Sequence, residues 1–238
     1  MNKDTFWKII DEVNAKTDQD DQEAILKATE KKLLALSSED IADWHRIRRM
    51  YTDLARRNDL WAACAATQSH CTDDGFIDFR SWLISRGKDT YMNALHDPDS
   101  LASLDFLKGT ADFELYAYVA GDCYAQKKAI ESKGLGAILM DYSAWIARHP
   151  NKLRSFSNEE RIADGYIQAL SKKYDVYKAD KHQSLCAETV AEIMSEIKLK
   201  PDIGNDWDLS DLPRLCPRLY EKYGDEPEEN ADMDLFQR

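Results

Sequence analysis

The sequence predicts an all-α protein, a multi-helix, bundle-like domain with a second helical segment packed on it. Two observations predict this class. Turn-forming residues are scarce, with 9 glycines and 6 prolines in 238 residues, whereas an architecture of many strands needs many turns. Hydrophobic residues make up 43% of the chain, and over most of its length they recur at the three- and four-residue spacing of amphipathic helices.

The first two predicted helices are amphipathic. Residues 4–16 follow a cap at Asp4 and place Phe6, Ile9 and Val13 at helical spacing. Residues 20–36 have charged residues outside and apolar residues on one side. Both patterns are typical of helices that cover a core.

The third predicted helix, 38–57, is the clearest, because Trp44, Ile47 and Tyr51 fall on one face. The segments that follow are more apolar. Residues 59–69 are small and apolar nearly all round, which indicates a buried helix. A helix from Gly75 stops at Gly87, and a short helix covers 88–96. Residues 112–130 are apolar over most of the circumference and are predicted to form the central helix.

The second part of the chain starts after the joint KGLG at 133–136. Helices are expected over 137–148, from the capping box of Ser157 and Glu160, and over 184–198. A short helix from Asp211 to Tyr223 is expected to return to the first part. The predicted organisation is therefore a helical core domain (1–130), an additional helical segment (131–200), a coil and returning helix (201–224), and an acidic tail expected to be disordered (225–238).

The charge balance bears on the partners of the protein. A net charge of −12 repels a phosphate backbone, so nucleic-acid binding is not expected, whereas a basic protein partner suits it. No apolar run is long enough to span a bilayer, and the start has no signal-peptide pattern. The five cysteines are scattered and odd in number, which predicts free thiols in a reducing cytoplasm.

No motif predicts a metal, a cofactor or a catalytic group. Asp73 and Asp74 are adjacent and Gly75 follows at once, which does not fit the alternating ligands of a calcium loop. We interpret Asp74 and Gly75 as the cap at the start of a helix. Cys64, His70 and Cys71 are close together, but the second ligand pair of a zinc site is missing. The chain also lacks the nucleophile elbow, the phosphate loop and the dinucleotide-binding glycine motif.

Arg80 is the residue that the pattern leaves unexplained. On a helix from Gly75 it falls in the middle of the apolar face, between Phe76 and Ile84. A buried guanidinium needs acceptors, because an unpaired buried charge is very costly. Three carboxylates are candidate partners: Asp59, Asp73 and Glu114. Arg80 is then either an internal clamp between helices or the base of a cleft for the carboxylate or phosphate of a ligand.

Several motifs resemble those of the bacterial domain-of-unknown-function 4240 family. They are DLWAA at 59–63, C-x-DDGF-x-DFR-x-WLI-x-x-G at 71–87, PDSL at 98–101 and the closing LPRLCPRLYEKYG at 212–224. The resemblance is specific over 59–101 and extends over about 1–130. It implies an α-helical fold and no established activity, cofactor or catalytic residue. Some relatives occur beside modules linked to nucleic-acid metabolism or molybdate regulation.

Three functions remain open. We favour a non-enzymatic protein-interaction module, such as an inhibitor or immunity-type partner of a basic protein. Its expected contact region is the acidic coil, with the candidate residues Asp202, Asp206, Trp207 and Asp208. The second hypothesis is a small-ligand-binding protein or enzyme with a cleft around Arg80. The third, a DNA-associated regulator, rests on the family resemblance alone.

Overall fold

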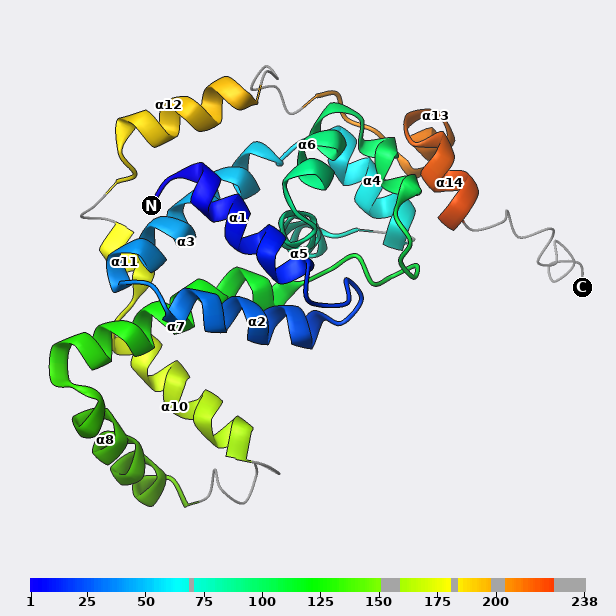
Figure 1. Ribbon diagram of the computed structural model, residues 1–238. Coiled ribbons are helices and arrows are strands. Elements are labelled where there is room, and N and C mark those ends of the chain that lie inside the picture. Colours follow the sequence, from blue (N-terminus) through cyan, green and yellow to red (C-terminus); the bar gives the residue numbers. More distant parts are fainter. Residues whose placement is uncertain (69–70, 151–158, 181–183, 198–203, 225–238) are drawn as a thin grey trace, which may run out of the picture. The chain divides into compact units, whose positions relative to one another are not determined.

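The computed structural model describes residues 1–68, 71–150, 159–180, 184–197 and 204–224, and these contain helices and no strand (Figure 1). The predicted all-α class is confirmed. The chain divides into two compact units. The first unit comprises 1–51 and 114–198, and the second comprises 52–113 and 199–238. The expected core domain, 1–130, therefore contributes to both units. None of the described helices is long and apolar enough to cross a membrane.

The first unit is built around α7 (Glu114–Lys133), the predicted central helix. Its other helices are α1 (Lys3–Asn14), α2 (Gln22–Leu34), α3 (Ser38–Leu54) up to residue 51, α8 (Leu135–Arg148), α10 (Glu159–Lys173), α11 (Val176–Asp180) and α12 (Ala187–Glu196). Both α2 and α10 pack along α7. Aromatic rings fill the core beside them, where Phe6 contacts Trp44 at 5.1 Å and Tyr51 at 5.6 Å between ring centroids. These large buried rings account for much of the stabilisation of this unit.

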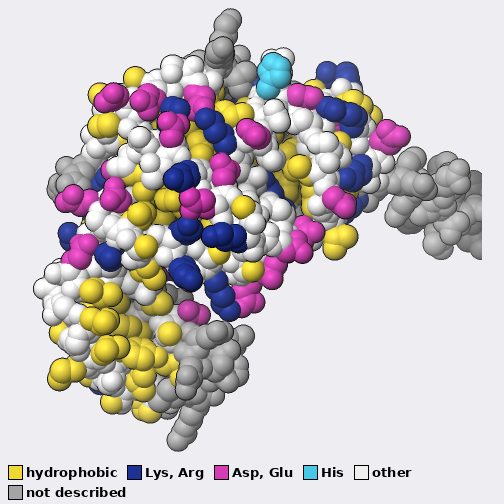
Figure 2. All heavy atoms as spheres, viewed as in Figure 1, with side chains coloured by type: hydrophobic (Ala, Val, Ile, Leu, Met, Phe, Trp, Pro, Cys, Tyr) yellow, Lys and Arg dark blue, Asp and Glu magenta, His cyan; other side chains and the backbone are white. Residues whose placement is uncertain are grey.

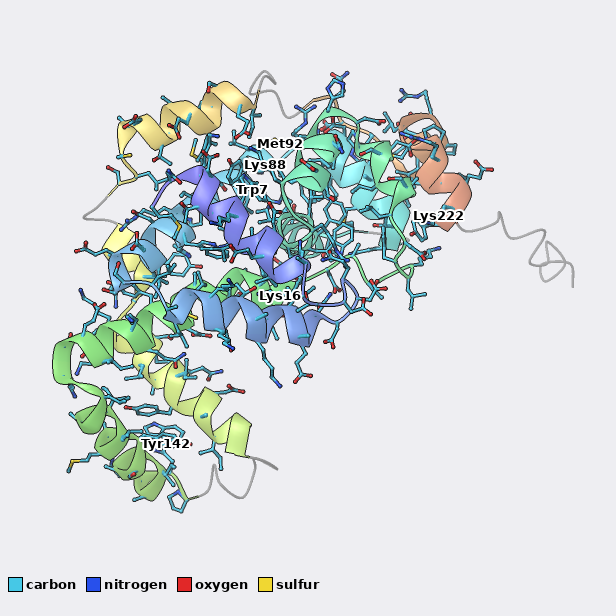
Figure 3. The ribbon with its side chains drawn as sticks, in the orientation of Figure 1. Trp7, Lys16, Lys88, Met92, Tyr142 and Lys222 are labelled. Carbon is cyan, nitrogen blue, oxygen red and sulfur yellow. A yellow bond between two sulfur atoms is a disulfide. The ribbon has the colours of Figure 1, made fainter. Side chains whose placement is uncertain are left out.

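Helices α8 and α10 form a hairpin that packs on α7 through a small core of its own. Hydrophobic side chains gather over this hairpin in Figure 2, and Leu135, Leu139 and Met140 of α8 are exposed. On the inner side, Tyr142 points from α8 toward α10 and its ring lies 5.1 Å from that of Tyr166 (Figure 3). This hairpin belongs to the additional segment predicted after residue 130.

The second unit joins two distant stretches of sequence. Its helices are α4 (Asn58–Gln68), α5 (Asp73–Ser85), α6 (Lys88–His96), η1 (Pro98–Ser103), η2 (Leu209–Asp211), α13 (Leu212–Leu215) and α14 (Pro217–Tyr223). Both α13 and α14 pack on α4, and α14 also packs on η1. Successive ring contacts run through the unit from Trp61 to Tyr223, by way of Phe76, Phe79, Trp82 and Phe106.

A disulfide joins Cys64 and Cys71, so the expectation of five free thiols is wrong for this pair. Cys64 lies in α4, and Cys71 lies two residues before α5 begins. Their Cα atoms are 6.0 Å apart, a distance that a disulfide spans. Seven residues of separation gave no signal of the pairing. The other three cysteines, Cys123, Cys186 and Cys216, are free.

Candidate functional site

The guanidinium of Arg80 is enclosed, with 7% of the residue exposed. Its Nε donates to the Phe76 carbonyl at 3.2 Å, and its Nη1 donates to the Thr52 carbonyl at 2.8 Å. The charge also lies 4.7 Å from the centre of the Phe76 ring. Burial lowers the pKa of Arg80, and the charge of Asp53 opposes that effect. The acceptors of this buried cation are therefore main-chain carbonyls and an aromatic face.

The three carboxylates proposed as partners of Arg80 lie elsewhere, and none forms an ion pair with it in the described part of the chain. Asp59 accepts two hydrogen bonds from Arg57, at 3.0 and 2.6 Å. Asp73 is exposed in the first turn of α5. Glu114 begins α7 and belongs to the first unit, whereas Arg80 belongs to the second. The structure does not assemble these residues into one charged cluster.

The start of α5 lies slightly earlier than the sequence indicates. Thr72 is the N-cap, and its hydroxyl accepts from the backbone N–H of Gly75 at 3.1 Å. The interpretation of Asp74 and Gly75 as the cap is therefore wrong by two residues, since both lie inside the first turn. The aspartate charge still favours the positive end of the helix. The stop at Gly87 agrees with the structure, where its φ of 95° follows the end of α5.

The acidic coil is ordered over its described part, 204–211, while Asp202 lies outside the described residues. The side-chain amide of Asn58 donates to the carbonyls of Gly204 and Asn205 and to the carboxylate of Asp206. Asp208 caps η2, where its carboxylate accepts from the backbone N–H of Ser210 at 2.8 Å. Trp207 is half-buried between two exposed aspartates.

Sequence reasoning missed the anchor of the C-terminal helix. Asp99, buried with 5% of the residue exposed, accepts from the backbone N–H groups of Arg218 and Leu219 and from the Arg218 guanidinium. Burial raises the pKa of Asp99, but these hydrogen bonds outweigh it and hold the pKa below its usual value. Two motifs far apart in the sequence, PDSL and LPRLCPRLYEKYG, thus meet in the second unit. Spacing alone could not pair residues separated by 119 positions.

Sequence reasoning also missed a hollow beside α7 in the first unit. It is lined by buried His45 of α3 and by side chains of α7, α10, α11 and the loop between α10 and α11. The latter include Tyr118, Asp122, Ser171, Tyr174 and Tyr177. The His45 ring meets that of Tyr177 edge to face at 4.7 Å. Burial, followed by the charges of nearby arginines on α3, lowers the pKa of His45 to about 3. The signal in the sequence was Gly121, a glycine in the middle of a long apolar helix.

Carboxylates gather next to this hollow. Glu30 of α2 and Asp122 of α7 are partly buried, and burial raises the pKa of both. The charge of exposed Asp164 on α10 raises both pKa values further. Ser171 partly offsets this effect by donating to Asp122 Oδ1 at 2.8 Å. Among the described residues, no group of three or more acidic, histidine or cysteine side chains could hold a metal ion.

Comparison with known proteins agrees with the motifs. A family model described as "Protein of unknown function (DUF4240)" matches residues 1–126. No match is found among curated proteins or among solved structures. The matched residues include α3, the buried Arg80 and Asp99, and the α7 residues Tyr118 and Asp122. The resemblance predicted from the sequence is confirmed, and the chain belongs to the DUF4240 family of proteins of unknown function.

Proposed function

We propose that this chain is a non-enzymatic protein-interaction module that binds a basic protein, as an inhibitor or immunity-type partner would. The observation that carries the proposal is the acidic coil of the second unit. Half-buried Trp207 stands between exposed Asp206 and Asp208. Tryptophan is the side chain most often found at the energetic centre of an interface, and flanking carboxylates complement lysine and arginine.

The order of the coil supports this function. Asn58 holds its first residues by three hydrogen bonds, and Asp208 caps the short helix that follows. A segment that is already ordered loses less conformational entropy on binding, so more of the contact energy remains as affinity. The carboxylate of Asp206 stays exposed although one of its oxygens accepts from Asn58. Its charge is therefore available to a cationic partner.

The surroundings of Arg80 favour this proposal over a ligand cleft at that position. The guanidinium is enclosed and donates to two carbonyls of its own chain. A ligand carboxylate or phosphate at this position would have to displace those acceptors and the Phe76 ring. Asp206 and Asp208 of the coil, by contrast, are exposed. We therefore place the proposed recognition at the coil and give Arg80 a structural role.

The test uses the full chain as bait for proteins of the cell that produces it, at low and at high salt. We expect the wild-type chain to recover a basic protein at low salt and to lose it at high salt, because exposed charges are screened. Trp207→Ala should weaken binding of the purified partner about tenfold or more. The matched control is Asp105→Asn, which removes an exposed aspartate of the same unit outside the coil. Equal binding by Trp207→Ala and wild type would contradict the proposal.

A further inference from the structure

The hollow beside α7 has a volume of about 270 Å³ and lies wholly within the first unit. The part of its lining that α7 contributes includes Ala117 and Gly121 of the sequence AYVAGD. These two residues are one helical turn apart and carry little or no side chain. Tyr118 and Asp122 are also one turn apart, and they form a second row of lining side chains on α7 next to Ala117 and Gly121. Glycine inside a helix costs about 1 kcal/mol relative to alanine. This glycine keeps the space beside α7 open.

The open side of Gly121 faces α11. A Cβ atom at this position would meet Cγ1 of Val176 at 3.6 Å, which is ordinary van der Waals contact. A methyl group therefore fits, whereas a larger side chain would have to displace Val176 or occupy the hollow that both residues line. Position 121 thus offers a way to fill the space without removing any polar group from its walls.

The hollow is lined by two carboxylates, Asp122 and Asp175, and one lysine. Asp175 pairs with Lys178 at 3.7 Å, whereas Asp122 accepts a hydrogen bond from Ser171 and forms no ion pair within the described residues. The charge of nearby Asp164 raises the pKa of Asp122. Lys172 also lines the hollow, but it forms no ion pair with Asp122 in the structure as described. An anion would be repelled here, and a neutral apolar group would bury Asp122 further without a partner.

Tyrosine rings complete the walls. Two of them already interact with cations of the chain, since Arg49 lies 5.7 Å from the centre of the Tyr177 ring and Lys173 lies 5.3 Å from that of Tyr174. Tyr118 is 51% exposed, and within the described residues no cation lies over its ring. An aromatic face and a carboxylate one helical turn apart are a pair that attracts organic cations.

We propose that this hollow binds an organic cation with an alkylammonium group, with Asp122 as its counter-ion and Tyr118 as its aromatic wall. The alkyl part would lie over Ala117 and Gly121. The shape and chemistry agree with this class, because ligand sites combine apolar walls with a few polar groups that fix orientation. The site belongs to the first unit and is independent of the acidic coil, so either proposal can fail without the other.

The experiment titrates the full chain with n-butylammonium, and separately with 1-butanol as the neutral molecule of the same shape, by ligand-detected NMR. We expect butylammonium to bind and butanol to bind at least tenfold more weakly. Asp122→Asn should weaken butylammonium at least tenfold, because the amide keeps an acceptor for Ser171 but removes the charge. Gly121→Leu should abolish binding by filling the hollow. The control Glu192→Gln removes a charge on α12 outside the lining and should leave affinity unchanged.

Thermal unfolding of each variant shows whether it is folded. If Asp122→Asn does not fold, Tyr118→Leu, which changes an exposed ring, is used for the same test. A lysine tripeptide with blocked ends identifies the source of the cation. Tighter binding of the peptide than of butylammonium supports a lysine side chain of a partner, and binding of butylammonium alone supports a free amine. Butanol binding as tightly as butylammonium, no binding by either cation, or unchanged affinity in folded Asp122→Asn overturns the proposal.

Discussion

At the residue scale, Arg80 of α5 donates a hydrogen bond to the C-terminal end of another helix, α3. Thr52, whose carbonyl it binds, lies in the last turn of α3, at the negative end of that helix. The last turn of α3 contains no basic residue of its own. Arg80 of α5 supplies the cation that the negative end of the helix favours. This contact explains why an arginine occupies a position where the pattern calls for leucine.

We expect Arg80→Met to lower the free energy of unfolding by about 2–4 kcal/mol, because the Thr52 carbonyl loses the charged donor and the Phe76 ring loses the cation above it. Methionine keeps the length of the side chain and removes the charge. Urea unfolding measures the difference. Arg56→Met, at an exposed arginine of the same unit, should change stability by less than about 0.5 kcal/mol. An Arg80→Met chain as stable as wild type would show that the contact is dispensable.

The burial of His45 leads us to expect that the free energy of unfolding depends on pH. Burial lowers its folded-state pKa to about 3, so the folded chain stays neutral at this position while the unfolded chain takes up a proton below about pH 6.5. The stability it contributes is complete above pH 6.5 and is lost as pH falls toward 3, by up to about 1.4 kcal/mol per pH unit. In His45→Leu this dependence should disappear. Urea unfolding between pH 6.5 and 4.5 compares the two slopes, and parallel curves would contradict the assignment.

At the scale of elements, charged side chains repeatedly bind the ends of neighbouring helices. The Glu131 carboxylate accepts from Ser38 at the start of α3, and Lys127 donates to the Leu34 carbonyl at the end of α2. In the second unit, Asp99 binds the start of α14, and Lys222 of α14 donates to two carbonyls at the end of η1 (Figure 3). Each charge has the sign that the helix end favours.

This pattern explains which features could be predicted from the sequence. The apolar periodicity of segments such as α3 and α7 depends only on nearby residues, so their existence and their burial could be predicted. The acceptors of Arg80 could not, because main-chain carbonyls leave no mark on the sequence. The pairing of Asp99 with Arg218 and the Cys64–Cys71 disulfide depend on the path of the chain. Gly121 could be recognised in the sequence as a glycine inside a helix. The hollow beside it could not be predicted, because the side chains that complete its lining come from α10 and α11.

At the scale of the whole molecule, each compact unit is made from stretches that are far apart in the sequence. The second unit illustrates the consequence. The family match ends at residue 126, yet Asp99 within it bonds α14 beyond it. Leu219 and Cys216 are almost fully buried, and Tyr223 stacks on Phe106 at 4.9 Å. The C-terminal helices are therefore part of the core of this unit rather than an appendage to it.

We expect a chain that ends at residue 198 to lose the fold of the second unit and keep that of the first. Removing each large buried side chain of α13 and α14 costs about 2–5 kcal/mol, so the total reaches the 5–15 kcal/mol that stabilises a typical domain. Hydrogen exchange should then show loss of protection in α4 and α5, with α1 and α7 unchanged. The control ends at residue 224, which removes the acidic tail and keeps α14. Equal protection of α4 and α5 in both truncated chains would show that the second unit folds without its C-terminal helices.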